Sequence, residues 1–152
     1  MDRRTVLKGV VGAGTLGVAG FALSDWRPSQ PPLRWKPSSP PPSIVADYEF
    51  RIVDRRVNED TTEPPDITCL NDTAVRVRGT VMHSSSDVFG LESMSYQNGT
   101  FEVLTAVEEK PGADDAIIPV YEVEISFTEM PDRIRAVEDS SHETVSTEHE
   151  CR

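Results

Sequence analysis

The sequence predicts an all-β protein: a single antiparallel β-sandwich of about seven strands, immunoglobulin-like in shape. After residue 43, apolar and polar side chains alternate with a period of two over most of the chain. Turn-forming Asn, Gly and Pro residues separate these runs. About 109 residues carry the pattern, which is enough for one hydrophobic core but not for two. We expect three parts: a signal or membrane-anchor helix over residues 1–24, a Pro-rich linker over 25–43 and the sandwich over 44–152.

The first 24 residues have the layout of an export signal. Arg3, Arg4 and Lys8 precede sixteen residues, 9–24, that carry no charge. A basic start, a short apolar stretch and small residues near its end are typical of a secretory leader. The paired arginines, placed just before apolar residues, resemble a twin-arginine translocation signal. This resemblance implies an extracytoplasmic protein, secreted or anchored to the outer face of the cell membrane.

The sequence leaves open whether the leader is cleaved. Gly20-Phe21-Ala22 offers small residues for cleavage. The alternative is an uncleaved anchor. Sixteen helical residues span about 24 Å, less than the roughly 30 Å of a hydrocarbon core, but Trp26 and Arg27 follow at headgroup depth. Under either interpretation, the N-terminal segment makes the membrane or cell envelope a partner.

Residues 28–43 contain seven of the twelve prolines. Proline fixes φ and donates no backbone hydrogen bond, so this run predicts polyproline II, about 50 Å long at about 3.1 Å per residue. We expect a stiff spacer. The alternative is a ligand for a proline-binding groove, assisted by Trp35, which is a less common use of such composition.

Alternation places the strands in order along the domain. Apolar residues recur at every second position over residues 47–52, 75–81, 91–96, 101–107, 121–127, 133–138 and 145–151. The run 121–127 is the most regular. Residues 91–96 change phase, which predicts a bulge, and the last two runs alternate less strictly.

Turn signals separate these runs. Asn98-Gly99 is a hairpin signal, because both residues tolerate the positive φ of a type I′ turn. Residues 110–115 and 129–132 contain further Pro and Gly or Asp turn residues. Residues 58–66, with Pro64-Pro65, predict a loop that crosses between sheets. The Cys…Trp…Cys spacing of antibody domains is missing, since both tryptophans precede the domain.

The domain is strongly acidic. Residues 44–152 contain 24 acidic and 9 basic residues, a net charge of −15, within a chain of net charge −11. Nucleic acid is therefore excluded as a partner, because its binding draws on clustered Lys and Arg. Only three of the fifteen basic residues are lysines. An acidic, lysine-poor surface resembles that of proteins from salt-loving archaea, in which salt screens the self-repulsion.

A resemblance extends over about residues 74–138. The stretches that carry it are Arg78-Gly79-Thr80-Val81, residues 91–96, 100–107 and 121–127, and Met130-Pro131-Asp132-Arg133-Ile134. They resemble small exported β domains of halophilic archaea, whose function is not assigned. Those domains often carry cysteines at loops that correspond to residues 84–87 and 114–116, where this chain has none. The resemblance implies fold and compartment, and no chemistry.

Cys69 and Cys151 are the only cysteines. In an exported chain such a pair favours a disulfide. Closing a loop of about 80 residues stabilises a protein by up to roughly 4 kcal/mol in the chain-entropy model. Two separate thiols and a bond between chains are the alternatives.

The C-terminal residues include metal-ligating types. In an extended strand His149 and Cys151 share a face, whereas His142 points to the other. Two converging ligands are too few for zinc or copper. A blue-copper domain draws ligands from a C-terminal loop, and we do not expect one here, because only Arg152 follows Cys151. We therefore predict no metal site and no cofactor.

Residues 83–87, His-Ser-Ser-Ser-Asp, contain the residue types of a hydrolase triad. The Gly-x-Ser-x-Gly elbow is absent, so we expect a polar turn and predict no catalytic residue. The acidic pairs at 108–109 and 114–115 lack the spacing of a calcium loop. Asn71 and Asn98 begin Asn-x-Thr sequons and are candidate glycosylation sites.

The sequence thus predicts an exported, surface-exposed sandwich with a structural or binding role and a protein or glycan partner of unspecified identity. The alternative is an extracytoplasmic hydrolase or metal-binding protein whose site is assembled across strands.

Overall fold

The computed structural model describes residues 33–56, 63–112 and 115–151. Within these ranges the chain forms ten strands and no helix, which confirms the all-β prediction. No helix in this part of the chain is long and apolar enough to cross a membrane. The predicted signal or anchor, with Arg3, Arg4 and Lys8, lies outside the described residues, as does the linker before residue 33.

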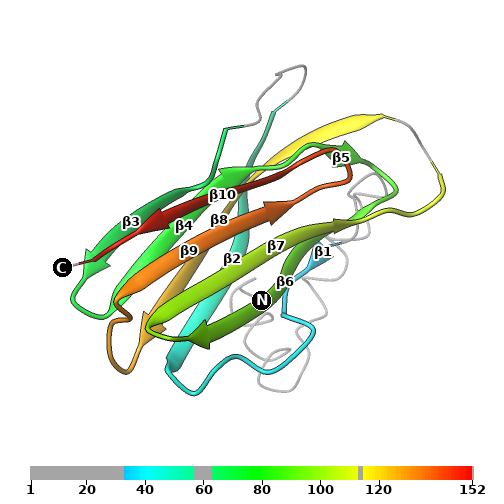
Figure 1. The fold of residues 1–152 in the computed structure, drawn as a ribbon. Coiled ribbons are helices and arrows are strands. Elements are labelled where there is room, and N and C mark those ends of the chain that lie inside the picture. The colour runs from blue at the N-terminus through cyan, green and yellow to red at the C-terminus, as the bar shows by residue number, and fades with distance from the viewer. Residues whose placement is uncertain (1–32, 57–62, 113–114, 152) are drawn as a thin grey trace, which may run out of the picture. The chain divides into compact units, whose positions relative to one another are not determined.

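The strands form two sheets that face each other (Figure 1). The first sheet has the order β1 (Leu33–Arg34), β6 (Val88–Gln97), β7 (Thr100–Glu108), β9 (Arg133–Asp139) and β10 (Thr144–His149). The second has the order β2 (Val45–Arg56), β8 (Ala116–Phe127), β4 (Ala74–Thr80) and β3 (Asp66–Asn71). A short strand, β5 (His83–Ser84), pairs with the beginning of β8.

The prediction of a purely antiparallel sandwich is wrong at two pairs of strands. β7 pairs with β9 in parallel, with Thr100 opposite Arg133, and β1 pairs with β6 in parallel. The first case follows from the path of the chain. After β7 the chain crosses to the other sheet as β8, and it then returns to the first sheet in the original direction as β9. A crossover of this kind gives parallel neighbours, whereas a hairpin gives antiparallel ones.

The hydrophobic core lies between the two sheets. Aromatic rings contact one another across it. The ring centroids of Phe89 on β6 and Tyr121 on β8 are 5.6 Å apart, and those of Phe101 on β7 and Phe127 on β8 are 4.8 Å apart. The alternating residues predicted to point inward are buried on β4, β7, β8 and β9. Because both inner faces are apolar, their burial is the main force that holds the sheets together.

Local details test the turn and bulge predictions. Asn98 and Gly99 have φ values of 51° and 79°, as a type I′ turn between β6 and β7 requires. The bulge predicted within residues 91–96 is present as a register shift between Leu91 and Ser93. Both predictions are confirmed.

The sequence missed β1, β3 and β5, and it misplaced one connection. The segment containing Pro64-Pro65 was expected to cross between sheets, but it joins β2 to β3 within one sheet. β3 was missed because only Ile67 and Cys69 face inward on this edge strand, which is too little alternation to recognise.

The second half of the predicted linker packs on the sandwich. Leu33 and Arg34 pair with β6, and the ring of Trp35 lies 5.7 Å from that of Phe50, edge to face. The hydroxyl of Ser38 donates a hydrogen bond of 2.7 Å to the backbone carbonyl of Glu92. Residues 33–43 therefore run along the sandwich instead of forming part of a free spacer.

Candidate functional site

A disulfide joins Cys69 and Cys151 at one edge of the sandwich. Cys69 lies in β3, and Cys151 follows the end of β10 by two residues; their Cα atoms are 5.7 Å apart. In Figure 1, β10 runs beside β3 toward the C-terminus. The pairing that the sequence favoured over separate thiols is the one in the structure. It ties the edge strand of one sheet to the edge strand of the other.

His149 lies next to this disulfide. A ring nitrogen of His149 and the two sulfur atoms all lie within 4.8 Å of one another. The imidazole is exposed, and both cysteines are half-buried. In the part of the chain that the structure describes, no other group of three such metal-ligating side chains comes together. The sequence had paired Cys69 with Cys151 and had placed His149 on the same face as Cys151, but it had not combined the two observations into a group of three ligands.

Residues 83–87 form the predicted polar turn. One carboxylate oxygen of Asp87 accepts a hydrogen bond of 2.9 Å from the backbone N–H of Ser84. The other accepts one of 3.0 Å from the backbone N–H of Lys110. Because both oxygens bind backbone amides, Asp87 fastens this turn to the β7–β8 connection and does not orient a catalytic base.

His83 is buried beneath this turn, with 4% of its surface exposed. Its Nδ1 lies 2.8 Å from the carbonyl oxygen of Ser84, so Nδ1 carries the proton, because a carbonyl only accepts. Burial lowers the pKa of His83, which keeps the ring neutral near pH 7. Nε2 has no hydrogen-bond partner among the described residues. The ring stacks on Phe89 and borders an open hollow of about 560 Å³ that His142 also lines.

A polar pair inside the core links the two sheets. The hydroxyl of Tyr121 on β8 donates a hydrogen bond of 2.7 Å to Oε1 of Glu138 on β9. Both side chains are almost fully buried. Burial raises the pKa of Glu138 to about 7, against the opposing effect of hydrogen bonds from Tyr121 and the backbone of Thr80. Burial also raises the pKa of Tyr121 well above its usual value, so the phenol keeps its proton.

Glu138 borders a small cavity of about 40 Å³ between the sheets. Thr80, Met82, His142 and Glu143 are among its lining residues. The cavity has the volume of one or two water molecules. It is too small for an organic substrate, so we assign the Tyr121–Glu138 pair to the packing of the sheets.

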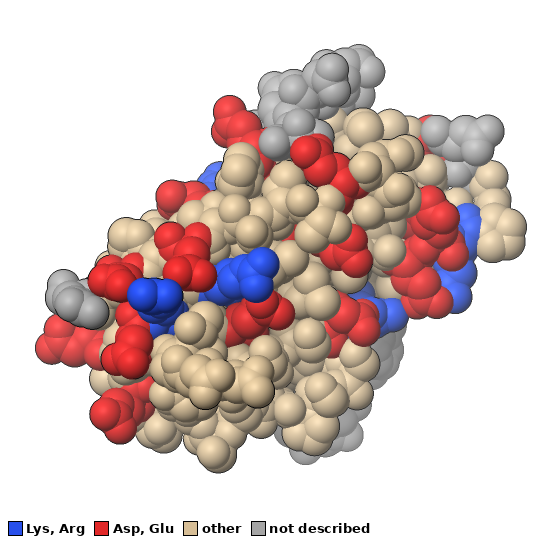
Figure 2. Space-filling model, viewed as in Figure 1, with Lys and Arg blue, Asp and Glu red and all other residues tan. Residues whose placement is uncertain are grey.

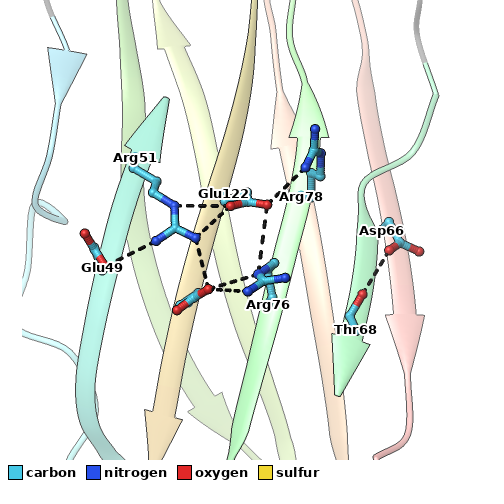
Figure 3. Close-up of polar contacts among 8 residues, drawn as sticks. Glu49, Arg51, Asp66, Thr68, Arg76, Arg78 and Glu122 are labelled. Carbon is cyan, nitrogen blue, oxygen red and sulfur yellow. Dashed lines mark hydrogen bonds and ion pairs between the residues drawn. The ribbon is translucent and has the colours of Figure 1, made fainter. Parts of the chain in front are cut away.

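An ion-pair network covers the outer face of the second sheet (Figure 3). Glu122 of β8 accepts hydrogen bonds from Arg51 of β2 at 2.8 and 3.1 Å and from Arg78 of β4 at 3.2 Å. Glu124 binds Arg51 at 3.0 Å and Arg76 at 2.6 Å. The guanidinium groups cover Glu122, which is only 5% exposed although it faces outward. The hydrogen bond from Arg51 is the largest cause of a lowered pKa at Glu122.

This network leaves no basic patch. The three arginines face three carboxylates, those of Glu122, Glu124 and the more exposed Glu49. On the face shown in Figure 2, acidic side chains are spread widely and basic ones are few. The arginine charges on the second sheet are therefore matched locally, and the visible face is acidic.

Both sequons lie at exposed turns. Asn71 ends β3, and its side-chain oxygen accepts hydrogen bonds from the backbone N–H of Thr73 at 2.8 Å and from its hydroxyl at 3.2 Å. Asn98 occupies the first position of the β6–β7 hairpin turn. Both side chains are open to solvent.

No protein-family model, curated protein or solved structure matches this chain. The assessment of function therefore depends on the chemistry of the described residues. The hydrolase-like residues form a turn, and the buried pair lies in the packing between the sheets. The edge with Cys69, His149 and Cys151 is the place where reactive groups converge at the surface.

Proposed function

We propose that this chain is an exported β-sandwich module with a structural or binding role. In this proposal the module is secreted, or anchored to the outer face of the membrane by its N-terminal segment. The observation that carries the proposal is the disulfide between the edge strands of the two sheets. Such bonds form and persist in oxidising compartments and are rare in the cytosol. The basic, then uncharged, N-terminal sequence is consistent with the same destination.

We also propose an immunoglobulin-like shape for the sandwich. Two facing sheets, a core of alternating residues and a chain that passes repeatedly between the sheets support it. The parallel β7–β9 pair arises from one of these passages.

A non-catalytic role is supported by what the polar residues contact. Asp87 binds two backbone amides, and Glu138 binds Tyr121 inside the core. A catalytic carboxylate needs an oxygen available to a substrate. Both oxygens of Asp87 accept hydrogen bonds from backbone amides, and Glu138 borders a cavity of only about 40 Å³.

The expected partners follow from the charge and the turns. The acidic domain supports a cell-envelope or protein partner and argues against nucleic acid. It also supports an origin in a salt-loving archaeon. The exposed positions of Asn71 and Asn98 allow glycan attachment.

The proposal is tested by locating variants of the full chain in cells. Replacing Arg3 and Arg4 together by lysine keeps the charge but removes the paired guanidinium groups. We expect the variant to accumulate inside the cell with Met1 retained. Arg27→Lys, just after the leader, is the matched control and should be exported as the unmodified chain is. Export of the double variant equal to that of the control would contradict a twin-arginine route. Cytoplasmic retention of the unmodified chain would overturn the proposed function.

A further inference from the structure

The edge that the disulfide closes holds a third metal-ligating group. Cys69 of β3, Cys151 and His149 at the end of β10 offer two sulfurs and one imidazole nitrogen, all within 4.8 Å of one another. Thiolate and imidazole are the ligands that structural zinc sites use. The three groups come from two strands that belong to different sheets.

The fold explains why these three side chains meet. His149 and Cys151 are two residues apart in extended chain and so share a face. β3 and β10 are the neighbouring edges of the two sheets, and Cys69 lies on β3 at the level where β10 ends. The arrangement is thus set by strand position, and it does not depend on the sulfur–sulfur bond alone.

We propose that Cys69, His149 and Cys151 form a Zn²⁺ site when the disulfide is reduced. A dithiol reductant breaks the sulfur–sulfur bond: two electrons and two protons pass to the cysteines, and the reductant becomes a cyclic disulfide. The two thiols then lose their protons to solvent as the metal binds, and neutral His149 supplies a lone pair. Water completes the four ligands of the metal.

The distances suit this ligand set. With zinc–sulfur bonds of about 2.3 Å, two thiolates in a tetrahedral site lie about 3.8 Å apart. In this structure the two sulfurs are bonded to each other, so they have to move apart after reduction, whereas a ring nitrogen of His149 is already within 4.8 Å of both. Cys151 lies two residues beyond the end of β10 and Cys69 lies on an edge strand, so the sulfurs can separate without displacing the core.

The surrounding charge favours a cation. Asp72 lines a hollow of about 200 Å³ together with Cys69 and Cys151. Glu148 and Glu150 flank His149 in the sequence and share one cation, Arg133, at 3.5 and 3.4 Å, and the domain as a whole carries a charge of −15. A negative field of this kind attracts divalent cations and opposes anions. The same edge is therefore closed by a disulfide under oxidising conditions and by zinc under reducing ones.

The test uses the purified full chain, reduced with a phosphine. The phosphine is oxidised to a phosphine oxide, whose oxygen comes from water. Native mass spectrometry counts bound Zn²⁺, and Co²⁺ serves as a spectroscopic probe because thiolate ligands give it a charge-transfer band. We expect one metal ion per reduced chain and none on the oxidised chain. His149→Ala should weaken binding at least tenfold. His142→Ala, which removes an exposed histidine outside the group, should leave the affinity unchanged.

Three results would overturn the inference. They are equal metal binding by the reduced and oxidised chains, equal affinity of the His149→Ala and His142→Ala variants, and a Co²⁺ complex without the thiolate band. Both histidines are exposed, so neither substitution should prevent folding, and circular dichroism checks this. The measurement is made on purified protein, so its outcome does not depend on whether the chain is exported.

Discussion

Tyr121 and Glu138 lie on opposite sheets and are joined by a hydrogen bond of 2.7 Å inside the core. The phenol donates to a carboxyl group whose pKa burial has raised to about 7. Gly79 passes so close to this pair that an added Cβ would lie 2.8 Å from the Tyr121 hydroxyl oxygen. The polar pair is thus enclosed by backbone as well as by side chains, and its protonation affects how the sheets pack.

Glu138 should make stability depend on pH. Its pKa rises from an unfolded value of 4.5 to about 7 in the fold, so the folded state holds a proton that the unfolded state has lost between these values. The free energy of unfolding should therefore fall as pH rises through this range, by about 3 kcal/mol, and then level off. Glu138→Gln should remove this fall and be more stable than the unmodified protein at pH 8.

The control for Glu138→Gln is Glu129→Gln, at an exposed turn position. Urea unfolding at constant ionic strength compares the proteins at pH 5 and pH 8. Identical pH dependence of the Glu138→Gln variant and the control would contradict the assignment.

Glu122 should contribute to stability in the opposite pH direction. Its pKa is lowered, chiefly by the hydrogen bond from Arg51, so its contribution is present above pH 4.5 and is lost as the pH falls. Glu122→Gln should lower the free energy of unfolding at pH 7 by on the order of 1 kcal/mol. Glu49→Gln, on a side chain 66% exposed, should change it by less than about 0.5 kcal/mol. Equal effects in urea unfolding would show that the network adds nothing measurable.

Gly90 should be required for docking of residues 33–34. A Cβ at this position would collide with the backbone oxygen of Arg34, so Gly90→Ala should push β1 off the edge of β6. We expect faster tryptic cleavage after Arg34, followed by mass spectrometry. Ser95→Ala, at an exposed position of the same strand, is the control. Equal cleavage rates in the two variants would contradict the docking.

The disulfide should stabilise the sandwich strongly because it closes a loop over 82 positions. Replacing Cys69 and Cys151 together by serine should lower the free energy of unfolding by up to about 4 kcal/mol in the chain-entropy model. Unfolding is measured without reductant, so that the bond stays intact in the unmodified protein. An unchanged urea midpoint would exclude this role.

Salt should stabilise the domain. With a net charge of −15 over residues 44–152, repulsion between carboxylates opposes folding at low ionic strength. At 1 M salt the Debye length is about 3 Å, so most of this repulsion is screened. The melting temperature should rise from millimolar to molar KCl, and a flat response would count against a halophilic origin.

The sequence predicted the parts of the fold that depend on local pattern. Regular alternation located β4, β7 and β8, and the Asn98-Gly99 pair located a hairpin, because each of these signals is contained within a few residues. The beginning of β8 was missed because it contains Pro119, which pairs with Arg55 of β2. The parallel β7–β9 pair depends on which sheet receives β8, and no local signal encodes that choice.

The same limit applies to the candidate sites. The alternation of Ile134 and Ala136 places Glu138 on the core side, a signal that could have identified a buried acid. Its partner Tyr121 comes from the other sheet and could not be paired with it from sequence. His149 and Cys151 were placed on one face and Cys69 was paired with Cys151, but the distance of the His149 ring from both sulfurs depends on the position of β3, which alternation did not predict.

The most direct test of the account locates the native protein and maps its cysteines. Cells are blocked with an alkylating agent and separated into medium, membrane and cytoplasm, and the protein from each is sequenced from its N-terminus and mapped without reduction. The account predicts that the chain is found in the medium or on the outer membrane face, with Cys69 bonded to Cys151. An intact chain in the cytoplasm, with Met1 present and both cysteines alkylated, would contradict it.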